Sequence, residues 1–100
     1  MQLVQTRLPG VTIVQPVVHE DDRGSFVSAW DRDTWAEAEI GPFVQSNVSR
    51  SGPDVLRGLH FQRINPQGKL LTVLEGAVWD VAVDIRPDSP TCGEWVGVEL

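Results

Sequence analysis

The sequence AVWDVAVDI at residues 77–85 decides the fold class. Every second residue from Ala77 to Ile85 is apolar, so these side chains would share one face of an extended strand. Asp80 and Asp84 fall on the opposite face. Because unpaired carboxylates inside a sheet are costly, we expect them to reach Lys69 or an arginine, or to face solvent. The stretch therefore predicts a β-strand with one apolar and one polar side.

Similar short runs, separated by turn signals, extend in both directions from this strand. We expect further strands at residues 11–18, 24–30, 43–50, 55–62, 69–75 and 94–100. One helix is expected over residues 33–40, capped by Asp33 or Thr34 and ended by Gly41-Pro42. This arrangement predicts an all-β sandwich, jelly roll or barrel with one short helix.

The composition is typical of one soluble globular domain. The chain has 100 residues, of which 41% are hydrophobic and 22% are charged. No apolar run reaches the roughly 18 residues that a membrane-spanning helix needs, and the amino terminus lacks the pattern of a signal peptide. The single cysteine, Cys92, excludes an internal disulfide and fits a reducing cytoplasm. A net charge of −6 argues against a nucleic-acid partner.

The middle of the chain is basic although the whole is acidic. Residues 45–69 contain Arg50, Arg57, Arg63 and Lys69 against Asp54 alone, a local balance of +3. The segments on either side are acidic. This distribution suggests that one segment holds a small anionic ligand, although scattered surface arginines would give the same count.

Two residues of the basic segment, His60 and Lys69, are candidate catalytic residues. His60 lies in the apolar stretch LRGLHFQ, and its imidazole can accept a proton near neutral pH, although it could equally be a structural histidine. Strict alternation puts Arg57 and His60 on opposite faces, unless Gly58 hosts a bulge. Lys69 is the only lysine and could neutralise a developing enolate, or simply lie in a solvated turn.

The remaining candidates are weaker. Arg23, in an Asp-Arg-Gly turn, presents a guanidinium that could bind a phosphate. A metal site is not expected, because the only other histidine, His19, lies 41 residues before His60. The four tryptophans are expected to fill the core. Proton-transfer enzyme and anion-binding module remain open alternatives on these residues.

The order of five segments is similar to one known family. They are DDRGSF at residues 21–26, here with the frame Asp-x-Arg-Gly-x-Phe, FVQSNVSRS at 43–51, VLRGLHFQ at 55–62, QGKL at 67–70 and DVAVDIRPDSPT at 80–91. Together they closely resemble the dTDP-4-dehydrorhamnose 3,5-epimerase family, over roughly residues 10–100. The resemblance implies a cupin-type jelly roll. It also implies inversion of carbons 3 and 5 of dTDP-4-dehydro-6-deoxyglucose next to its 4-keto group, in dTDP-rhamnose biosynthesis and without a cofactor.

The resemblance also assigns roles by position. It implies that His60 is the general base and that Lys69 stabilises the enolate oxygen, with Asp84 orienting Lys69. Arg57 would bind the diphosphate. Arg23 would contact the nucleotide across a homodimer with exchanged amino-terminal strands. The remaining implied substrate-binding positions are Ser28, Gln45, Ser46 and Asn47.

Some departures from the family pattern keep alternatives open. The family usually has glutamate at Ser28 and aspartate at Ser46, and its tyrosine proton donor lies in the carboxy-terminal half, whereas this chain has no tyrosine. We therefore expect residues 1–100 to be the amino-terminal part of one epimerase-like domain that lacks its carboxy-terminal strands. The alternatives are a single-centre epimerase or ketoisomerase of another dTDP-deoxysugar pathway, and a non-catalytic nucleotide-sugar-binding fragment.

Overall fold

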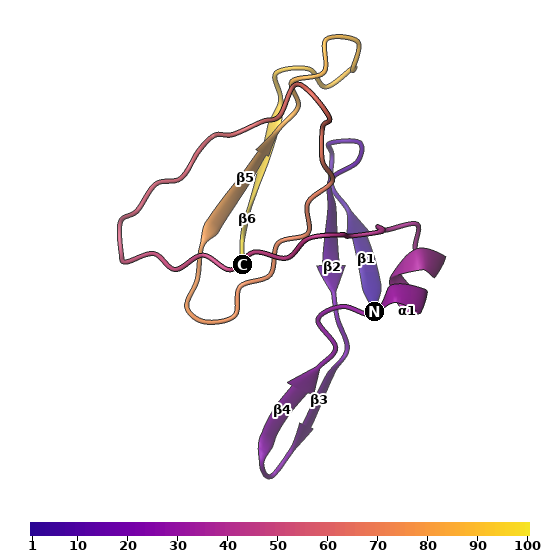
Figure 1. Ribbon diagram of the computed structural model, residues 1–100, viewed down its shortest axis with the longest axis vertical. Helices are drawn as coiled ribbons and strands as arrows, with labels where there is room; N and C mark the ends of the chain where they lie inside the picture. The colour runs from indigo at the N-terminus through magenta and orange to yellow at the C-terminus, as the bar shows by residue number, and fades with distance from the viewer. The chain divides into compact units, whose positions relative to one another are not determined.

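The structure, a computed structural model, describes all 100 residues and divides them into two compact units. Unit 1 comprises Met1–Ala29 and Thr72–Leu100, and unit 2 comprises Trp30–Leu71. All six strands belong to unit 1, and the one helix belongs to unit 2 (Figure 1). The expected all-β class with one short helix is confirmed.

Unit 1 consists of three antiparallel hairpins whose strands pair only within each hairpin. In the first hairpin, β1 (Gln2–Gln5) pairs with β2 (Thr12–Gln15). In the second, β3 (Val18–Asp21) pairs with β4 (Gly24–Val27), and in the third, β5 (Trp79–Val83) pairs with β6 (Trp95–Glu99).

The expected strand over residues 11–18 is interrupted. β2 ends at Gln15 and β3 begins at Val18, with Pro16 between them. Proline has no amide hydrogen to donate to a ladder, so the chain leaves one hairpin here and starts another. A further strand, β1, was not expected from the sequence; it pairs with β2 from Gln2 opposite Gln15 to Gln5 opposite Thr12.

The β3–β4 hairpin is short and fully exposed. Asp22 and Arg23 form the two-residue connection between Asp21 and Gly24, which pair across it. Gly24 has a φ of +131°, a region that side chains rarely adopt. Every residue of both strands is exposed. β4 ends at Val27, three residues before the expected end of this strand.

The decisive stretch at residues 77–85 contains β5, which is two residues shorter than expected at each end. Its register with β6 runs from Trp79 opposite Glu99 to Val83 opposite Trp95. Val78 and Leu100 extend the pairing by exchanging two backbone hydrogen bonds of 3.0 and 2.9 Å. The expected strand at residues 94–100 is thereby confirmed as well, one residue shorter at each end.

The expected helix forms as α1 (Arg32–Glu37), but its cap differs from the prediction. Asp31, rather than Asp33 or Thr34, is the N-cap, and its side chain accepts a 2.9 Å hydrogen bond from the Thr34 amide. This bond satisfies an amide that has no partner within the first helical turn. Trp35 is the buried residue of the helix.

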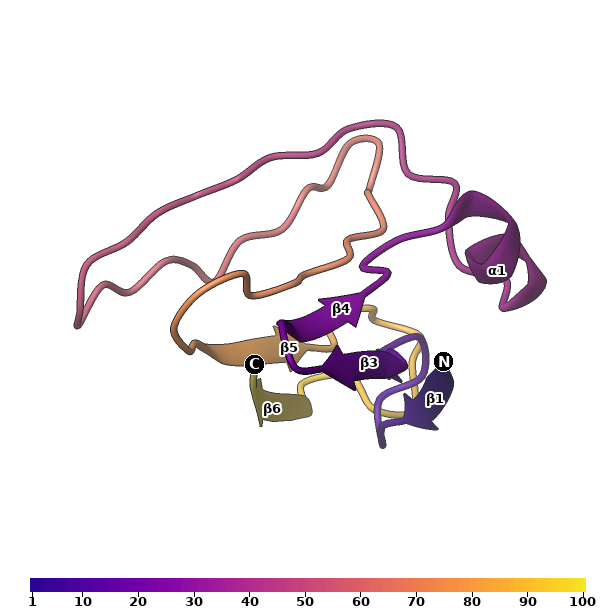
Figure 2. The same cartoon turned by 90° about the horizontal axis from the view of Figure 1, so that it is seen from below.

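Three expected strands are wrong: those at residues 43–50, 55–62 and 69–75 have no regular structure. No backbone amide between residues 41 and 77 donates to a backbone carbonyl. Figure 2 shows this stretch, from magenta to orange, as long open loops. A β-branched, alternating sequence favours extended backbone, but a strand also requires a neighbour to complete its ladder. No segment of this chain supplies that neighbour.

The buried core is correspondingly small. Leu8 and Trp35 are the buried apolar residues, at 1% and 4% exposure. The expectation that all four tryptophans fill the core is therefore wrong, because Trp30, Trp79 and Trp95 are about half exposed or more. No helix in the structure is long and apolar enough to cross a membrane.

Candidate functional site

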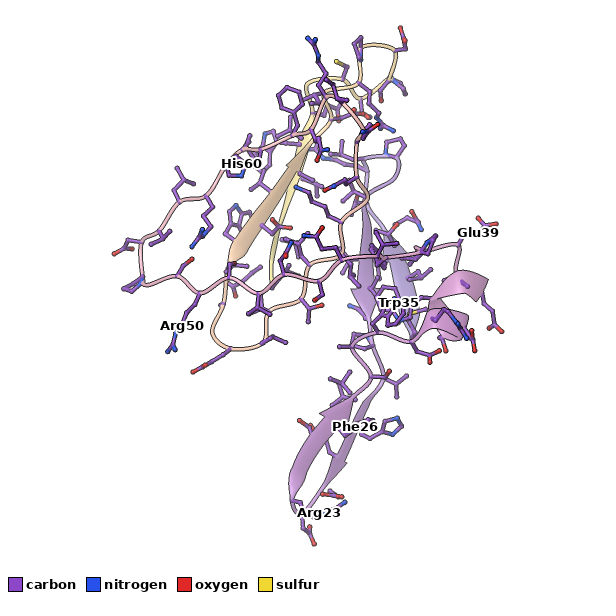
Figure 3. The ribbon with its side chains drawn as sticks, in the orientation of Figure 1. Arg23, Phe26, Trp35, Glu39, Arg50 and His60 are labelled. Carbon is purple, nitrogen blue, oxygen red and sulfur yellow. The ribbon has the colours of Figure 1, made fainter.

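His60 and Lys69, the expected base and enolate stabiliser, both lie in the irregular part of unit 2. Both side chains are exposed. Figure 3 shows His60 on the open loop that follows residue 50. Unit 2 therefore presents an imidazole and an ammonium group that are free to meet a ligand.

Gly58 determines the backbone path between Arg57 and His60. Its φ is +108°, and a Cβ at this position would lie 3.3 Å from the His60 amide nitrogen. Only glycine suits such a conformation. Gly58 does not host a bulge, because a bulge requires a strand ladder and residues 55–62 have none.

Arg57 is held by the loop that precedes it. Its Nε donates to the Ser51 hydroxyl at 2.9 Å, and its Nη2 donates to the Arg50 carbonyl at 3.3 Å. Asp54, with a φ of +60°, turns the chain between these residues. Ser51 was not expected from the sequence as a partner of Arg57. The turn sequence SGPD at residues 51–54, which returns the chain on itself, was the available signal.

The segment of Gln45, Ser46 and Asn47 is exposed and has no regular secondary structure. The Gln45 amide Nε2 donates to Asn47 Oδ1 at 3.2 Å. This contact brings two of the expected substrate-binding side chains together. Both remain on the surface and can exchange this hydrogen bond for one to a ligand.

Arg23 belongs to unit 1 and lies at the tip of the β3–β4 hairpin (Figure 3). Its Nη2 and Nε donate to Asp21 Oδ2 at 2.5 and 3.1 Å, and its backbone amide donates to Asp21 Oδ1 at 2.8 Å. These bonds from Arg23 lower the pKa of the Asp21 carboxyl. Residues 19–21 and 23–26, including His19 and Phe26, line a shallow cleft on this hairpin. Ser28, just after β4, is exposed.

Asp84, also in unit 1, is the one buried charged residue. Its carboxylate accepts hydrogen bonds from Arg86, Ser89 and Thr91. An arginine partner was expected and Arg86 supplies it, whereas the two hydroxyl partners were not expected. These bonds, with Arg86 as the largest contribution, hold the pKa of Asp84 well below its usual range. The pattern Asp-x-Arg-x-x-Ser-x-Thr within residues 84–91 carried this signal.

The chain is similar to known proteins over nearly its whole length. A family model described as dTDP-4-dehydrorhamnose 3,5-epimerase matches residues 5–100. The enzyme of that name from Salmonella typhimurium is 51% identical over 100% of this chain and 56% of its own length. The one from Methanothermobacter thermautotrophicus is 47% identical over 99% of this chain and 54% of its own.

Solved structures show the same likeness in three dimensions. The dTDP-6-deoxy-D-glucose-3,5-epimerase RmlC from Legionella pneumophila, in complex with dTDP-4-keto-L-rhamnose, aligns with a TM-score of 0.93 and 46% identity. The alignment covers 99% of this chain and 54% of that structure. The epimerase from Bacillus anthracis, with TDP and PPi bound, aligns with a TM-score of 0.91 and 35% identity over 99% of this chain and 58% of that structure.

The order of the quoted segments and the likeness to these solved structures thus define the class of the chain, that of the sugar-nucleotide epimerases. The chain belongs to the dTDP-4-dehydrorhamnose 3,5-epimerase family. The resemblance noted from the sequence is therefore confirmed. The chain spans about half the length of the relatives it matches.

Proposed function

We propose that the whole protein to which these residues belong inverts carbons 3 and 5 of dTDP-4-dehydro-6-deoxyglucose in dTDP-rhamnose biosynthesis. The observation that carries the proposal is membership of the 3,5-epimerase family over residues 5–100, which include LRGLHFQ and QGKL. A ketone acidifies the C–H bonds on both sides, so one base and one stabiliser of the enolate oxygen can serve both centres without a cofactor.

His60 and Lys69 take the two central roles in this proposal. The His60 imidazole removes the proton from the carbon next to the ketone, and the Lys69 ammonium group stabilises the negative charge that develops on the ketone oxygen. A proton returned to the opposite face of the sugar completes the inversion. This chain contains no tyrosine, so the tyrosine that the family uses as proton donor would come from outside residues 1–100.

The nucleotide contacts are proposed for Arg57, Gln45, Ser46, Asn47 and Ser28. Support comes from their exposure and from the positive charge of residues 45–69. Arg57 already has its guanidinium fixed by Ser51 and Arg50, which lowers the entropic cost of binding a diphosphate. Asp84 was assigned to orient Lys69, and its surroundings lead to a different proposal below.

Arg23 is proposed to reach the nucleotide of a second subunit in a homodimer with exchanged amino-terminal strands. The support is the β3–β4 hairpin itself, which is exposed along both strands and carries Arg23 at its tip (Figure 3). We further propose that residues 1–100 form the amino-terminal part of one domain of a cytoplasmic enzyme. The lone cysteine and the extra length of the relatives support this proposal.

Proton exchange in deuterated water tests the function directly. The whole protein is incubated with dTDP-4-dehydro-6-deoxyglucose, and deuterium is located by NMR. Label at both carbon 3 and carbon 5 is expected. Label at one carbon supports a single-centre enzyme instead. No label from a folded protein that still binds the nucleotide supports a binding module.

Three substitutions in the whole protein test the assigned roles. We expect His60→Ala to abolish deuterium incorporation and to retain nucleotide binding, and Lys69→Ala to lower the rate strongly. Arg57→Ala should mainly weaken binding. Arg63→Ala is the matched control, because Arg63 is an exposed arginine of the same basic segment. Turnover by His60→Ala would remove His60 from the role of base.

A further inference from the structure

The loop between β5 and β6 folds around a single carboxylate. The Asp84 side chain is 2% exposed. Its Oδ1 accepts from the Arg86 amide at 3.0 Å and from Arg86 Nε at 2.9 Å. Its Oδ2 accepts from Arg86 Nη2 at 2.8 Å, from the Ser89 hydroxyl at 2.5 Å and from the Thr91 hydroxyl at 2.7 Å. A carboxylate offers about four acceptor positions, so five donors leave none open.

The same loop is closed by its backbone. The Asp84 amide donates to the Glu94 carbonyl at 2.9 Å, and the Gly93 amide donates back to the Asp84 carbonyl at 2.7 Å. Asp84 is therefore fixed through its main chain as well as its side chain. Arg86 makes a two-point contact with Asp84 through Nε and Nη2, and this contact fixes the directions of its other guanidinium N–H groups.

One of these other N–H groups, on Nη2, points to the first hairpin. Arg86 Nη2 donates to the Pro9 carbonyl at 2.9 Å, across 77 residues of sequence. In the opposite direction, Arg7 donates to the Trp95 carbonyl and forms an ion pair with Glu94 at 3.5 Å. The turn between β1 and β2 is thus bound from both sides by arginines.

Apolar packing accompanies these contacts. Leu8, between Arg7 and Pro9, is the most buried residue of the chain at 1% exposure. Residues 8–11 and residues 83–86 together line one shallow cleft. The strands of the two hairpins do not pair with each other, so these loop contacts are what joins them.

We propose that Asp84 and Arg86 form a latch that fixes the turn of the first hairpin, residues 6–11, to the loop of the third, and that this is the role of the Asp84 carboxylate rather than orientation of Lys69. The proposal concerns the architecture of unit 1 and stands independently of the proposed function. Asp84 sets the guanidinium of Arg86, and Arg86 holds Pro9. Loss of either member should release the turn although neither β-ladder is altered.

Hydrogen–deuterium exchange of the whole protein tests the latch, read by mass spectrometry on peptides that cover residues 6–11 and 84–94. In the Asp84→Asn variant we expect exchange in both peptides to accelerate about tenfold or more, since a lost hydrogen bond to a charged group changes an opening equilibrium by about that factor. Arg86→Lys retains the charge beside Asp84 but lacks the planar fork, so residues 6–11 should again accelerate. Asp88→Asn is the control, because Asp88 is an exposed carboxylate of the same loop.

The pH dependence of turnover distinguishes the latch from the alternative role of Asp84, which is to orient Lys69. With the latch, the Arg86→Lys and Asp84→Asn proteins keep the wild-type shape of the pH–rate profile. Unchanged exchange at residues 6–11 in both variants would overturn the proposal. A changed pH–rate profile together with unchanged exchange would also overturn it, and would support the role of Asp84 in orienting Lys69. If Asp84→Asn does not fold, Arg86→Lys decides. Exchange is measured without substrate, so failure of the epimerase proposal would leave this test intact.

Discussion

The Arg23 side chain is held in place by a carboxylate that would also compete with a ligand for its guanidinium. Its guanidinium is occupied by Asp21, two residues away on the same exposed hairpin. A phosphate that binds Arg23 must therefore compete with a carboxylate. The competition is weak in water, because exposed ion pairs contribute little and are screened by salt.

This competition predicts the effect of removing Asp21. In the whole protein, Asp21→Asn should bind dTDP about two- to fivefold more tightly, since the anion no longer displaces a carboxylate from Arg23. Isothermal titration at low salt measures the change. Asp22→Asn removes the same charge from the neighbouring position, which makes no hydrogen bond to Arg23, and it should change binding less. Equal effects of the two variants would mean that only net charge matters.

Asp84 predicts a pH dependence of stability. Its pKa lies below the usual value in the folded protein because Arg86, Ser89 and Thr91 donate to the charged carboxylate. Above about pH 5 the carboxylate is charged in both states, and the full stabilisation is present. As the pH falls below about 4, the unfolded chain takes up a proton first, so the free energy of unfolding decreases.

The measurement compares the wild-type whole protein with Asp84→Asn by denaturant unfolding between pH 3 and 6. The difference in unfolding free energy should be largest near pH 6 and should shrink toward pH 3. Asp88→Asn should follow the wild type throughout this range. A difference that stays constant with pH would show that the charge of Asp84 does not contribute.

At the scale of elements, the β5–β6 hairpin depends on a close contact across its strands. A Cβ added at Gly97 would lie 2.4 Å from Trp79 Cζ2 and 2.8 Å from Trp79 Cε2. The indole therefore lies over the glycine. A methyl group there must displace the body of the ring rather than the end of a flexible chain.

Gly97→Ala should consequently destabilise the whole protein by about 1 kcal/mol or more, a cost within the range for overpacked sites. Chemical denaturation followed by tryptophan fluorescence measures the loss of stability, and the fluorescence of the folded protein reports the displacement of the indole. Gly52→Ala is the control, because a Cβ at Gly52 meets nothing within 4 Å and its φ is not in the left-handed region. Equal stability of the two variants would contradict the proposed contact.

The elements that could be predicted from the sequence are those with local partners. Residues 77–85 and 94–100 form a hairpin because each supplies the ladder of the other, and α1 satisfies its own backbone with help from Asp31. Residues 43–50, 55–62 and 69–75 have equally good strand patterns but no partner. A residue pattern specifies which backbone is favoured, whereas a ladder depends on a second segment.

The site shows the same division. The sequence and its family resemblance identified His60, Lys69 and Arg57 as candidate functional residues. They did not indicate that Ser51 fixes Arg57. They singled out Asp84 as a carboxylate of interest, but the donors that fill its lone pairs come from a loop conformation. The chemistry of each side chain follows directly from the residue type, whereas its hydrogen-bond partners depend on how the turns fold.

At the scale of the whole molecule, the most open region is residues 41–77. It makes no internal backbone hydrogen bonds, and several of its apolar residues are more than two-thirds exposed, among them Val44, Val48, Leu56, Phe61 and Leu74. Such a segment is stable only when something covers it. Relatives such as those from Salmonella typhimurium and Methanothermobacter thermautotrophicus are nearly twice as long as this chain, and in the whole protein proposed above the additional length would supply such cover.

Exchange of amide hydrogens tests this expectation. In a chain of residues 1–100 alone, residues 41–77 should exchange within seconds, whereas β5 and β6 should be protected. In the whole protein, protection should extend over residues 43–50 and 55–62, because these runs gain ladder partners. Equally fast exchange in both proteins would show that this segment stays open even in the longer chain.

The three hairpins also have a consequence for the order of events during synthesis. Each is built from contacts between residues close in sequence, which form in microseconds, far faster than a ribosome adds residues. They can form as soon as they emerge, whereas in a protein as long as the relatives, residues 41–77 would wait for partner segments that are translated later. During that interval a nascent chain carries three finished hairpins and one unpaired apolar stretch. That stretch is where a chaperone would bind, and where two nascent chains would associate wrongly.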